Sequence, residues 1–198
     1  MSQIPDFSTV RFTAPSKPID TGDARIRGAA ENPADGTIWA SFDDGCLPAG
    51  DMTVRSCLRI VAVRAGKAIY DGDVGWFGGD LYYPRIAVDG NGNAVVVHGY
   101  SSSAAFPSIG VFVLGENGGL TPSYPVAVGT EAHDNPRFGD YFGAAPDGSG
   151  GVWIVGENGT FVTGGSFDSI SAWSRSSSCS RRSASSRWRR SSGSISSA

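Results

Sequence analysis

Three segments of the chain repeat one plan, and this repetition is the strongest constraint on the fold. Each segment begins near an arginine (Arg25, Arg85 and Arg137), continues to a turn that contains Gly, and ends in a short apolar run. The arginines are separated by 60 and then by 52 residues. Regular self-similarity over such a distance indicates one supersecondary unit that is built several times and stacked on itself.

The repeated apolar runs have the length and composition of strands. Runs such as Leu58–Val63, Ala94–Val97 and Val111–Leu114 are bounded by Gly, Asn, Asp or Ser, and no apolar pattern of helical spacing exceeds two turns. Because these runs are continuous rather than alternating, we expect strands that are covered on both faces.

A period near 55 residues that contains only strands favours a β-propeller-like architecture. We therefore expect an all-β protein, a stack of about three four-stranded antiparallel blades that forms an incomplete ring. A sandwich of two sheets is the alternative, although sandwiches seldom show a repeat of this length.

Composition divides the chain into two parts. Residues 1–173 contain all 19 acidic groups and ten basic ones, and we expect a partial propeller there, with blade repeats near 20–75, 76–130 and 131–173. Residues 174–198 contain six Arg and thirteen Ser, which predicts a disordered tail. This switch falls where the plan requires another apolar strand. It suggests a shifted reading frame or an artificial end, with a genuine basic interaction tail as the alternative.

Charge and hydropathy exclude several classes of partner. The main body carries a net charge of −9, so we expect no nucleic-acid binding, which requires clustered positive charge. No apolar run approaches the roughly 20 residues of a membrane span, so we expect none. No signal peptide is visible in the sequence.

Three strings resemble blades of the sialidase-like propellers, a family with Asp-box repeats. They are residues 83–89 (YPRIAVD), 137–143 (RFGDYFG) and 166–173 (SFDSISAW). The third has the Ser, Asp and Trp of an Asp-box but carries Ile170 and Ala172 where the pattern has Gly and Thr. The resemblance implies an extracellular protein and a fragment of a larger secreted propeller. It also implies uncovered blade faces that could self-associate.

Two cysteines flank the predicted loop between the second and third strands of the first blade. Cys46 and Cys57 are eleven residues apart on strands that we expect to pair, so they could form a disulfide, as in secreted proteins. Two buried free thiols are the alternative.

The segment 71–83 concentrates aromatic and acidic side chains. Trp76, Phe77 and Tyr82 could stack on a sugar while Asp80 takes its hydroxyls. The alternative is that the aromatic rings only wedge between blades. The spacing of Asp71 and Asp73 also resembles the start of a calcium loop, but no Glu closes it, so we expect neither a metal nor another cofactor.

The family resemblance implies a second set of candidates. Sialidases hold a substrate carboxylate with arginines from separate blades, which would make Arg25, Arg85 and Arg137 the clamp, with Asp140 and Tyr141 as acid and nucleophile. The alternative is that each arginine braces its own blade, because catalytic residues seldom repeat in register.

These observations favour a non-catalytic propeller scaffold whose surface binds a glycan or a protein. The alternative is a sialidase-like glycoside hydrolase. We expect the binding surface on one rim of the blades, formed by residues 43–56, 71–83, 101–107 and 130–141.

Overall fold

The computed structural model describes residues 19–115, 117–132, 138, 142–162, 165–175 and 188–191, with side chains described up to residue 159. This part of the chain contains strands and turns and no helix. The strands are β1 (Ile26–Asn32), β2 (Thr37–Cys46), β3 (Arg55–Arg64), β4 (Lys67–Val74), β5 (Gly79–Val88), β6 (Ala94–Ser102), β7 (Ala105–Leu114), β8 (Tyr124–Ala127), β9 (Gly143–Pro146), β10 (Val152–Val162), β11 (Gly165–Arg175) and β12 (Trp188–Ser191).

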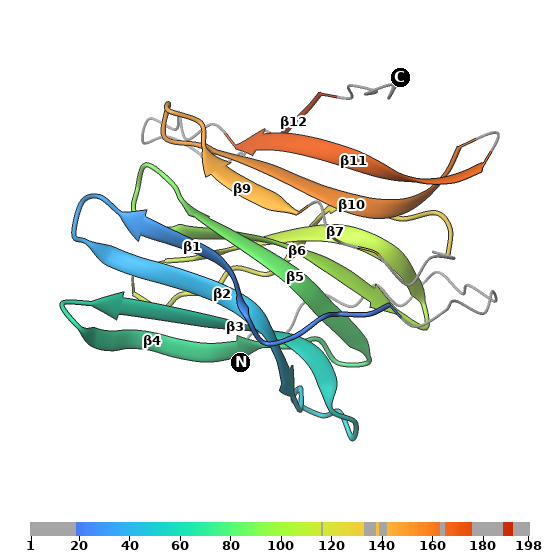
Figure 1. The fold of residues 1–198 in the computed structure, drawn as a ribbon, viewed down its shortest axis with the longest axis horizontal. Helices are drawn as coiled ribbons and strands as arrows, with labels where there is room; N and C mark the ends of the chain where they lie inside the picture. The colour runs from blue at the N-terminus through green and yellow to red at the C-terminus, as the bar shows by residue number, and fades with distance from the viewer. Residues whose placement is uncertain are drawn as a thin grey trace.

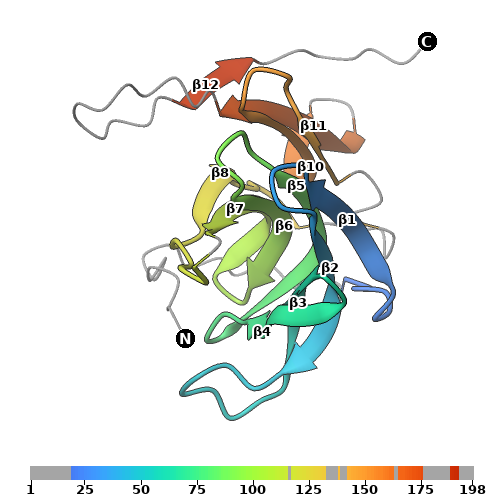
Figure 2. The same ribbon diagram turned by 90° about the vertical axis from the view of Figure 1, so that its left-hand side faces the viewer.

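The strands form three antiparallel sheets of four strands each. The first sheet has the order β1-β2-β3-β4, the second β5-β6-β7-β8 and the third β9-β10-β11-β12. Figures 1 and 2 show the three sheets stacked in chain order, with the second sheet in the middle. The predictions of an all-β fold and of four-stranded antiparallel sheets are confirmed, and the described strands do not close a ring. Strand β12 lies in the segment that the sequence predicts as disordered.

Two equivalent turns show the repeat at atomic detail. In the second sheet Asp89 accepts hydrogen bonds from the amides of residues 91 and 93 through its Oδ1, and its own amide donates to the carbonyl of Asn93. In the third sheet Asp147 makes the same bonds with the residues two and four positions later. The carboxylate therefore fixes each turn, in the way typical of Asp at the start of a tight turn.

The two turns also lie against each other. The amide of Gly90 donates to the carbonyl of Gly150 at 2.9 Å, and a Cβ on Gly90 would lie only 2.7 Å from the Cα of Gly150. A side chain at position 90 would thus push the second and third sheets apart, which explains the glycine there.

The hydrophobic core lies in two layers, one on each face of the second sheet. Between the first and second sheets, Trp39 and Ile60 pack with residues that include Val96 and Phe112. Between the second and third sheets, Val97 and other residues of β5, β6 and β7 pack with residues that include Phe138, Val152 and Ile154. The second sheet is consequently buried on both of its faces.

Burial separates the continuous apolar runs into two kinds. All residues of Ala94–Val97 are buried, and so are Val111, Phe112 and Leu114, as expected for strands covered on both sides. The run Leu58–Val63 instead alternates between buried and half-buried residues, so the expectation of double coverage is wrong there. The reason is that no other described sheet lies on the far side of the first sheet (Figure 1).

Within the part of the chain that the structure describes, no helix is long and apolar enough to cross a membrane.

Candidate functional site

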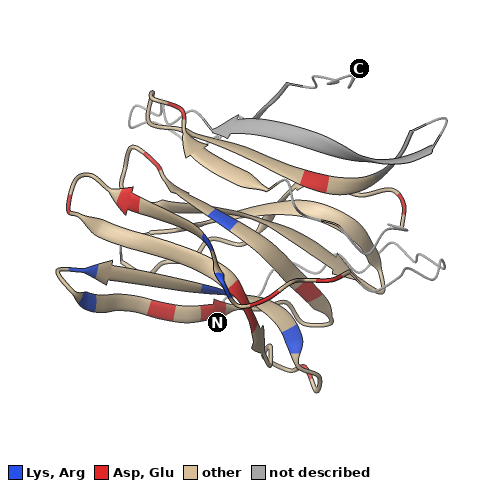
Figure 3. Ribbon diagram, viewed as in Figure 1, with Lys and Arg blue, Asp and Glu red and all other residues tan. Residues whose placement is uncertain are grey.

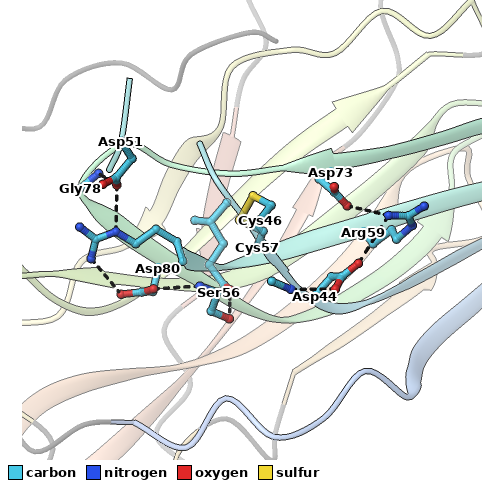
Figure 4. Close-up of a disulfide and its surroundings, with 12 residues drawn as sticks. Asp44, Cys46, Asp51, Ser56, Cys57, Arg59, Asp73, Gly78 and Asp80 are labelled. Atoms are coloured by element: carbon cyan, nitrogen blue, oxygen red, sulfur yellow. Dashed lines mark hydrogen bonds and ion pairs between the residues drawn. A yellow bond between two sulfur atoms is a disulfide. The ribbon is translucent and has the colours of Figure 1, made fainter. Parts of the chain in front are cut away.

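A disulfide closes the loop between β2 and β3. It joins Cys46 to Cys57, and the two Cα atoms are 5.7 Å apart (Figure 4). The two strands are antiparallel neighbours in which Asp44 pairs with Cys57 and Cys46 pairs with Arg55, so the bond runs diagonally across the ladder. It holds the ends of residues 47–54 together.

The connection from β4 to β5 passes directly over this disulfide. A Cβ on Gly75 would lie 2.8 Å from Sγ of Cys46 and 3.1 Å from Sγ of Cys57, so the chain passes this close only because residue 75 has no side chain. We call the loop 47–54 and the connection 75–78 together the rim. The sequence predicts a binding surface that includes both segments.

Asp51 ties the two segments of the rim to each other. Its Oδ2 accepts hydrogen bonds from Nε of Arg55 and from the amide of Gly78, both at 2.9 Å. Its Oδ1 accepts from the amides of Met52 and Thr53. The bond from Arg55, with help from these amides, holds the pKa of Asp51 well below its ordinary value. The rim is therefore a fixed structure and not a free loop.

Asp80 continues this network into the second sheet. Its Oδ1 accepts a hydrogen bond from the amide of Ser56 at 3.0 Å, and its Oδ2 lies 3.9 Å from Nη1 of Arg55 (Figure 4). The hydroxyl of Ser56 in turn donates to the carbonyl of Leu81. Asp80, which the sequence predicts to take sugar hydroxyls, thus also links the first and second sheets.

Four apolar side chains are exposed on the rim. The exposed fractions are 56% for Leu47, 97% for Met52, 69% for Val54 and 59% for Phe77. We call these four residues the rim patch. The ring of Phe77 lies next to the backbone of the opposing segment, because a Cβ on Gly50 would be 3.7 Å from it. Apolar side chains that are held outward on a braced loop are suited to binding.

The other two aromatic candidates do not lie on this surface. Trp76 is partly buried: its ring lies on Gly79 and packs edge-on against Tyr100, with centroids 5.8 Å apart. Tyr82 is fully buried and packs edge-on against Phe138, and burial raises the pKa of its hydroxyl. The structure therefore corrects the assignment of Tyr82 to ligand stacking and favours the wedge alternative for Trp76.

The arginine clamp is not supported in the residues that the structure describes. Arg25 lies before β1 and pairs with Asp23 on the surface, whereas Arg85 is half-buried in β5 and donates to the carbonyl of Pro84. Counted from the turn that joins the first two strands of each sheet, the fourth paired residue is Ala29 in β1, Arg85 in β5 and Gly143 in β9. Arg25 and Arg85 therefore do not occupy equivalent positions in their sheets. Arg137, Asp140 and Tyr141 lie outside the described residues.

Sequence reasoning missed a partly buried ion pair within the first sheet that also contacts the second sheet. Nε of Arg27 donates to Oδ2 of Asp43 at 2.9 Å, and the amide of Tyr83 donates to Oδ1 at 2.7 Å. The Arg27 guanidinium also lies 4.8 Å from the centre of the Tyr83 ring. Tyr83 has a φ of 54°, at an irregularity in the β5 ladder, and the hydrogen bond that its amide donates to Asp43 helps to hold this unusual backbone. Only the pair Asp43-Asp44 at the end of an apolar run could have signalled this cluster.

The two acids of the suggested calcium loop have another partner. Asp71 and Asp73 lie in β4, not in a loop, and both contact the guanidinium of Arg59, Asp71 through Nε at 2.9 Å and Asp73 through Nη1 at 3.4 Å. Within the described part of the chain, no cluster of three or more His, Cys, Asp or Glu is arranged to hold a metal ion.

His98 is in contact with a serine but is sealed in the core. Its Nε2 lies 2.9 Å from Oγ of Ser123 and its Nδ1 3.0 Å from the carbonyl of Gly99. Burial lowers the pKa of His98 to about 4, so the ring is neutral and bonds to both groups. Because His98 is fully buried, the pair braces β6 and offers no access to a substrate.

Comparison with known proteins does not name a family for this chain. No protein-family model matches it, and no curated protein is significantly similar to it.

Proposed function

We propose that this chain is a non-catalytic binding module that takes another polypeptide at the rim patch. The observation that carries the proposal is the exposure of four apolar side chains on a loop fixed by a disulfide and by Asp51. A fixed loop loses little conformational freedom when a partner binds, so more of the contact energy remains as affinity.

The composition of the rim patch favours a polypeptide over a glycan. Sugars stack on flat aromatic rings, and Phe77 is the one aromatic residue of the patch. Met52, Leu47 and Val54 are flexible or branched aliphatic groups, which fill irregular pockets on protein partners. The side chain of Asp80 is 39% exposed and places a charged group at the edge of the rim patch.

We also propose that the three sheets are the blades of a propeller-like stack. The sheets follow one another in chain order, each packs on the next, and the turns at Asp89 and Asp147 are equivalent. The disulfide supports an extracellular location, because such bonds persist in oxidising compartments.

The test is a selection of binding peptides from a random displayed library on the immobilised full chain. We expect the selected peptides to bind the Met52→Ser/Phe77→Ser double variant at least about tenfold more weakly, because two apolar anchors are lost. The matched control is Ile69→Ser, which changes an exposed apolar residue of β4 outside the rim and should leave binding unchanged.

Three results would overturn the proposal. Peptides that bind the double variant as tightly as the unchanged protein would remove the rim patch from the account. Hits on a glycan array that depend on Phe77 would assign the rim to sugars. Turnover of a fluorogenic sialoside by the purified chain would show an enzyme instead.

A further inference from the structure

The charged side chains beside the rim patch have an excess of carboxylates. The guanidinium of Arg55 lies 2.9 Å from a carboxylate oxygen of Asp51 and 3.9 Å from one of Asp80. Asp51 is largely buried and accepts hydrogen bonds from three backbone amides, whereas Asp80 is partly exposed. One guanidinium and two carboxylates leave one negative charge uncompensated at the edge of the patch.

A second acidic group continues from the rim along the first sheet. The carboxylates of Asp44, Asp71 and Asp73 all lie within 3.5 Å of the guanidinium of Arg59. We call these four residues the acidic track. All four side chains are partly exposed, so solvent and a partner can reach them. One positive and three negative groups leave two negative charges uncompensated there.

The strands around the acidic track supply no further positive charge near it. Apart from Arg55 and Arg59, the basic residues of β2, β3 and β4 are Arg64 and Lys67. These two pair with each other at the turn between β3 and β4, which is the opposite end of the sheet from the rim. Figure 3 shows the acidic residues of β4 in red and this basic turn in blue at the other end of the strand. The excess of negative charge is therefore local to the rim end.

The acidic track adjoins the rim. Cys57 and Arg59 share one face of β3, and Arg59 pairs with Asp73 of β4. Gly75, two residues after Asp73, lies on the disulfide, where the rim begins. A strand advances about 3.3 Å per residue, so the track and the rim are about 7 Å apart along the chain. Figure 4 shows the two charged groups on the two sides of the disulfide.

We propose that the polypeptide taken at the rim patch is basic. Its apolar side chains contact the rim patch, and Lys or Arg residues next to them lie over the acidic track and Asp80. This inference rests on the function proposed above. Charge complementarity of this kind speeds the encounter of two partners and selects against partners of the wrong charge.

The same charges disfavour two other occupants. Exposed Met52 and Phe77 would by themselves suit insertion into a membrane surface, but the uncompensated carboxylates repel anionic lipid headgroups. They repel the phosphates of nucleic acids in the same way. A polypeptide with both apolar and cationic side chains satisfies the rim patch and the acidic track together.

The segment of the partner that makes both contacts is short. An extended peptide of about six residues spans about 20 Å, which is longer than the step from the rim to the acidic track. We therefore expect the cationic residues to lie within about six positions of the apolar ones in the partner's sequence.

The first experiment runs the library selection in parallel on three immobilised proteins at low ionic strength. They are the unchanged chain, the Asp71→Asn/Asp73→Asn double variant and the matched control Glu31→Lys. Both variants make the net charge more positive by two, but Glu31 pairs with Ile38 at the end of the first sheet far from the rim. We expect peptides enriched in Lys and Arg from the unchanged chain and from Glu31→Lys, and loss of most of this enrichment on the double variant.

The second experiment measures the dissociation constant of one selected basic peptide by isothermal titration calorimetry. We expect Asp71→Asn/Asp73→Asn to weaken binding about three- to tenfold and Glu31→Lys to change it less than about twofold. Added salt should weaken binding to the unchanged chain more than binding to the double variant. A version of the peptide with Gln in place of each Lys and Arg should bind both proteins equally. Circular dichroism checks that each variant keeps its β structure.

The outcomes separate this inference from the proposed function. Peptides that depend on Met52 and Phe77 but carry no excess of basic residues would overturn the basic partner and leave the binding module standing. Equal binding of a basic peptide to the unchanged chain and to Asp71→Asn/Asp73→Asn would do the same. A selection without any peptide that depends on Met52 and Phe77 would overturn both proposals. Binding to vesicles of phosphatidylcholine and phosphatidylserine that is lost in Met52→Ser/Phe77→Ser would assign the rim patch to a lipid surface instead.

Discussion

The first and second sheets have the same strand order and similar strand sequences, yet they differ in how they are covered. Strand β6 is buried along seven consecutive residues, whereas β2 alternates between covered and uncovered positions. Both strands are rich in apolar residues. The comparison shows that an apolar strand sequence permits burial on both faces. How many faces are buried depends on the sheets that lie next to the strand. The apolar residues of β2 that no described sheet covers are therefore left partly exposed.

The first sheet compensates for its half-covered state with local links. The disulfide joins β2 to β3, Arg59 binds acids of β2 and β4, and Arg27 binds the buried Asp43. The second sheet has a core on each side and relies on packing. The two sheets should thus respond to different substitutions.

The largest effect is expected in the second sheet. Phe112→Ala removes a side chain that is 1% exposed, and we expect a loss of about 3–5 kcal/mol in the free energy of unfolding. Ile38→Ala in the first sheet is the comparison, with an expected loss of less than about 0.5 kcal/mol because Ile38 is 52% exposed. Urea denaturation at low protein concentration measures both, and equal losses would contradict the contrast.

The next effect concerns the disulfide of the first sheet. We expect Cys46→Ala with Cys57→Ala to lower the free energy of unfolding by about 2–4 kcal/mol, mainly because the unfolded chain regains the freedom of the closed loop. The same denaturation experiment applies, with hydrogen exchange of residues 47–54 as a local readout. If protection from hydrogen exchange falls in β6 as much as in residues 47–54, the disulfide does not act locally.

The smallest effect is the pH dependence of stability that two carboxylates contribute, Asp43 in β2 and Asp51 in the loop after it. Burial raises the pKa of Asp43 above its ordinary value of 3.8, so the folded state binds a proton more readily than the unfolded chain. Relative to Asp43→Asn, the unchanged protein should gain stability as the pH falls toward 3.8, and this gain should be lost as the pH rises through the folded pKa.

Asp51 should behave in the opposite way. The bond from Arg55 lowers its pKa, so its contribution is present above 3.8 and is lost as the pH falls below that value. Thermal midpoints of Asp43→Asn and Asp51→Asn, each compared with the unchanged protein between about pH 3 and 7, measure both differences. Curves with the same slope would contradict the assigned environments.

Much of the fold could be predicted because it depends on local signals. The Asp-Gly turns at 89 and 147 and the short apolar runs specify hairpins, and the period specifies how often they recur. The positions of Trp76 and Tyr82 could not be predicted, because an aromatic residue in a connection does not reveal where the strand begins. In the structure β5 begins at Gly79 and takes Tyr82 into the core.

The repeated arginines misled for a related reason. Matching Arg25 to Arg85 assumes regular ladders, but β1 has an irregularity between Ile26 and Gly28, and β5 has one between Tyr82 and Arg85. A bulge adds a residue to one strand without adding a residue pair to the ladder. Residues at equal spacing in the sequence therefore no longer occupy equivalent positions in the sheets. The rim patch carried a weak signal, because Leu47, Met52 and Val54 are apolar residues within a polar loop.

The central claim is that the second sheet is the one described sheet covered on both faces, with the first sheet as an uncovered end. Hydrogen exchange followed by mass spectrometry tests it directly on the unchanged chain at low protein concentration. The account predicts that β6 exchanges only through global unfolding, whereas β2 and β3 exchange through smaller openings that leave β6 protected. Protection of β2 and β3 equal to or greater than that of β6 would contradict the account.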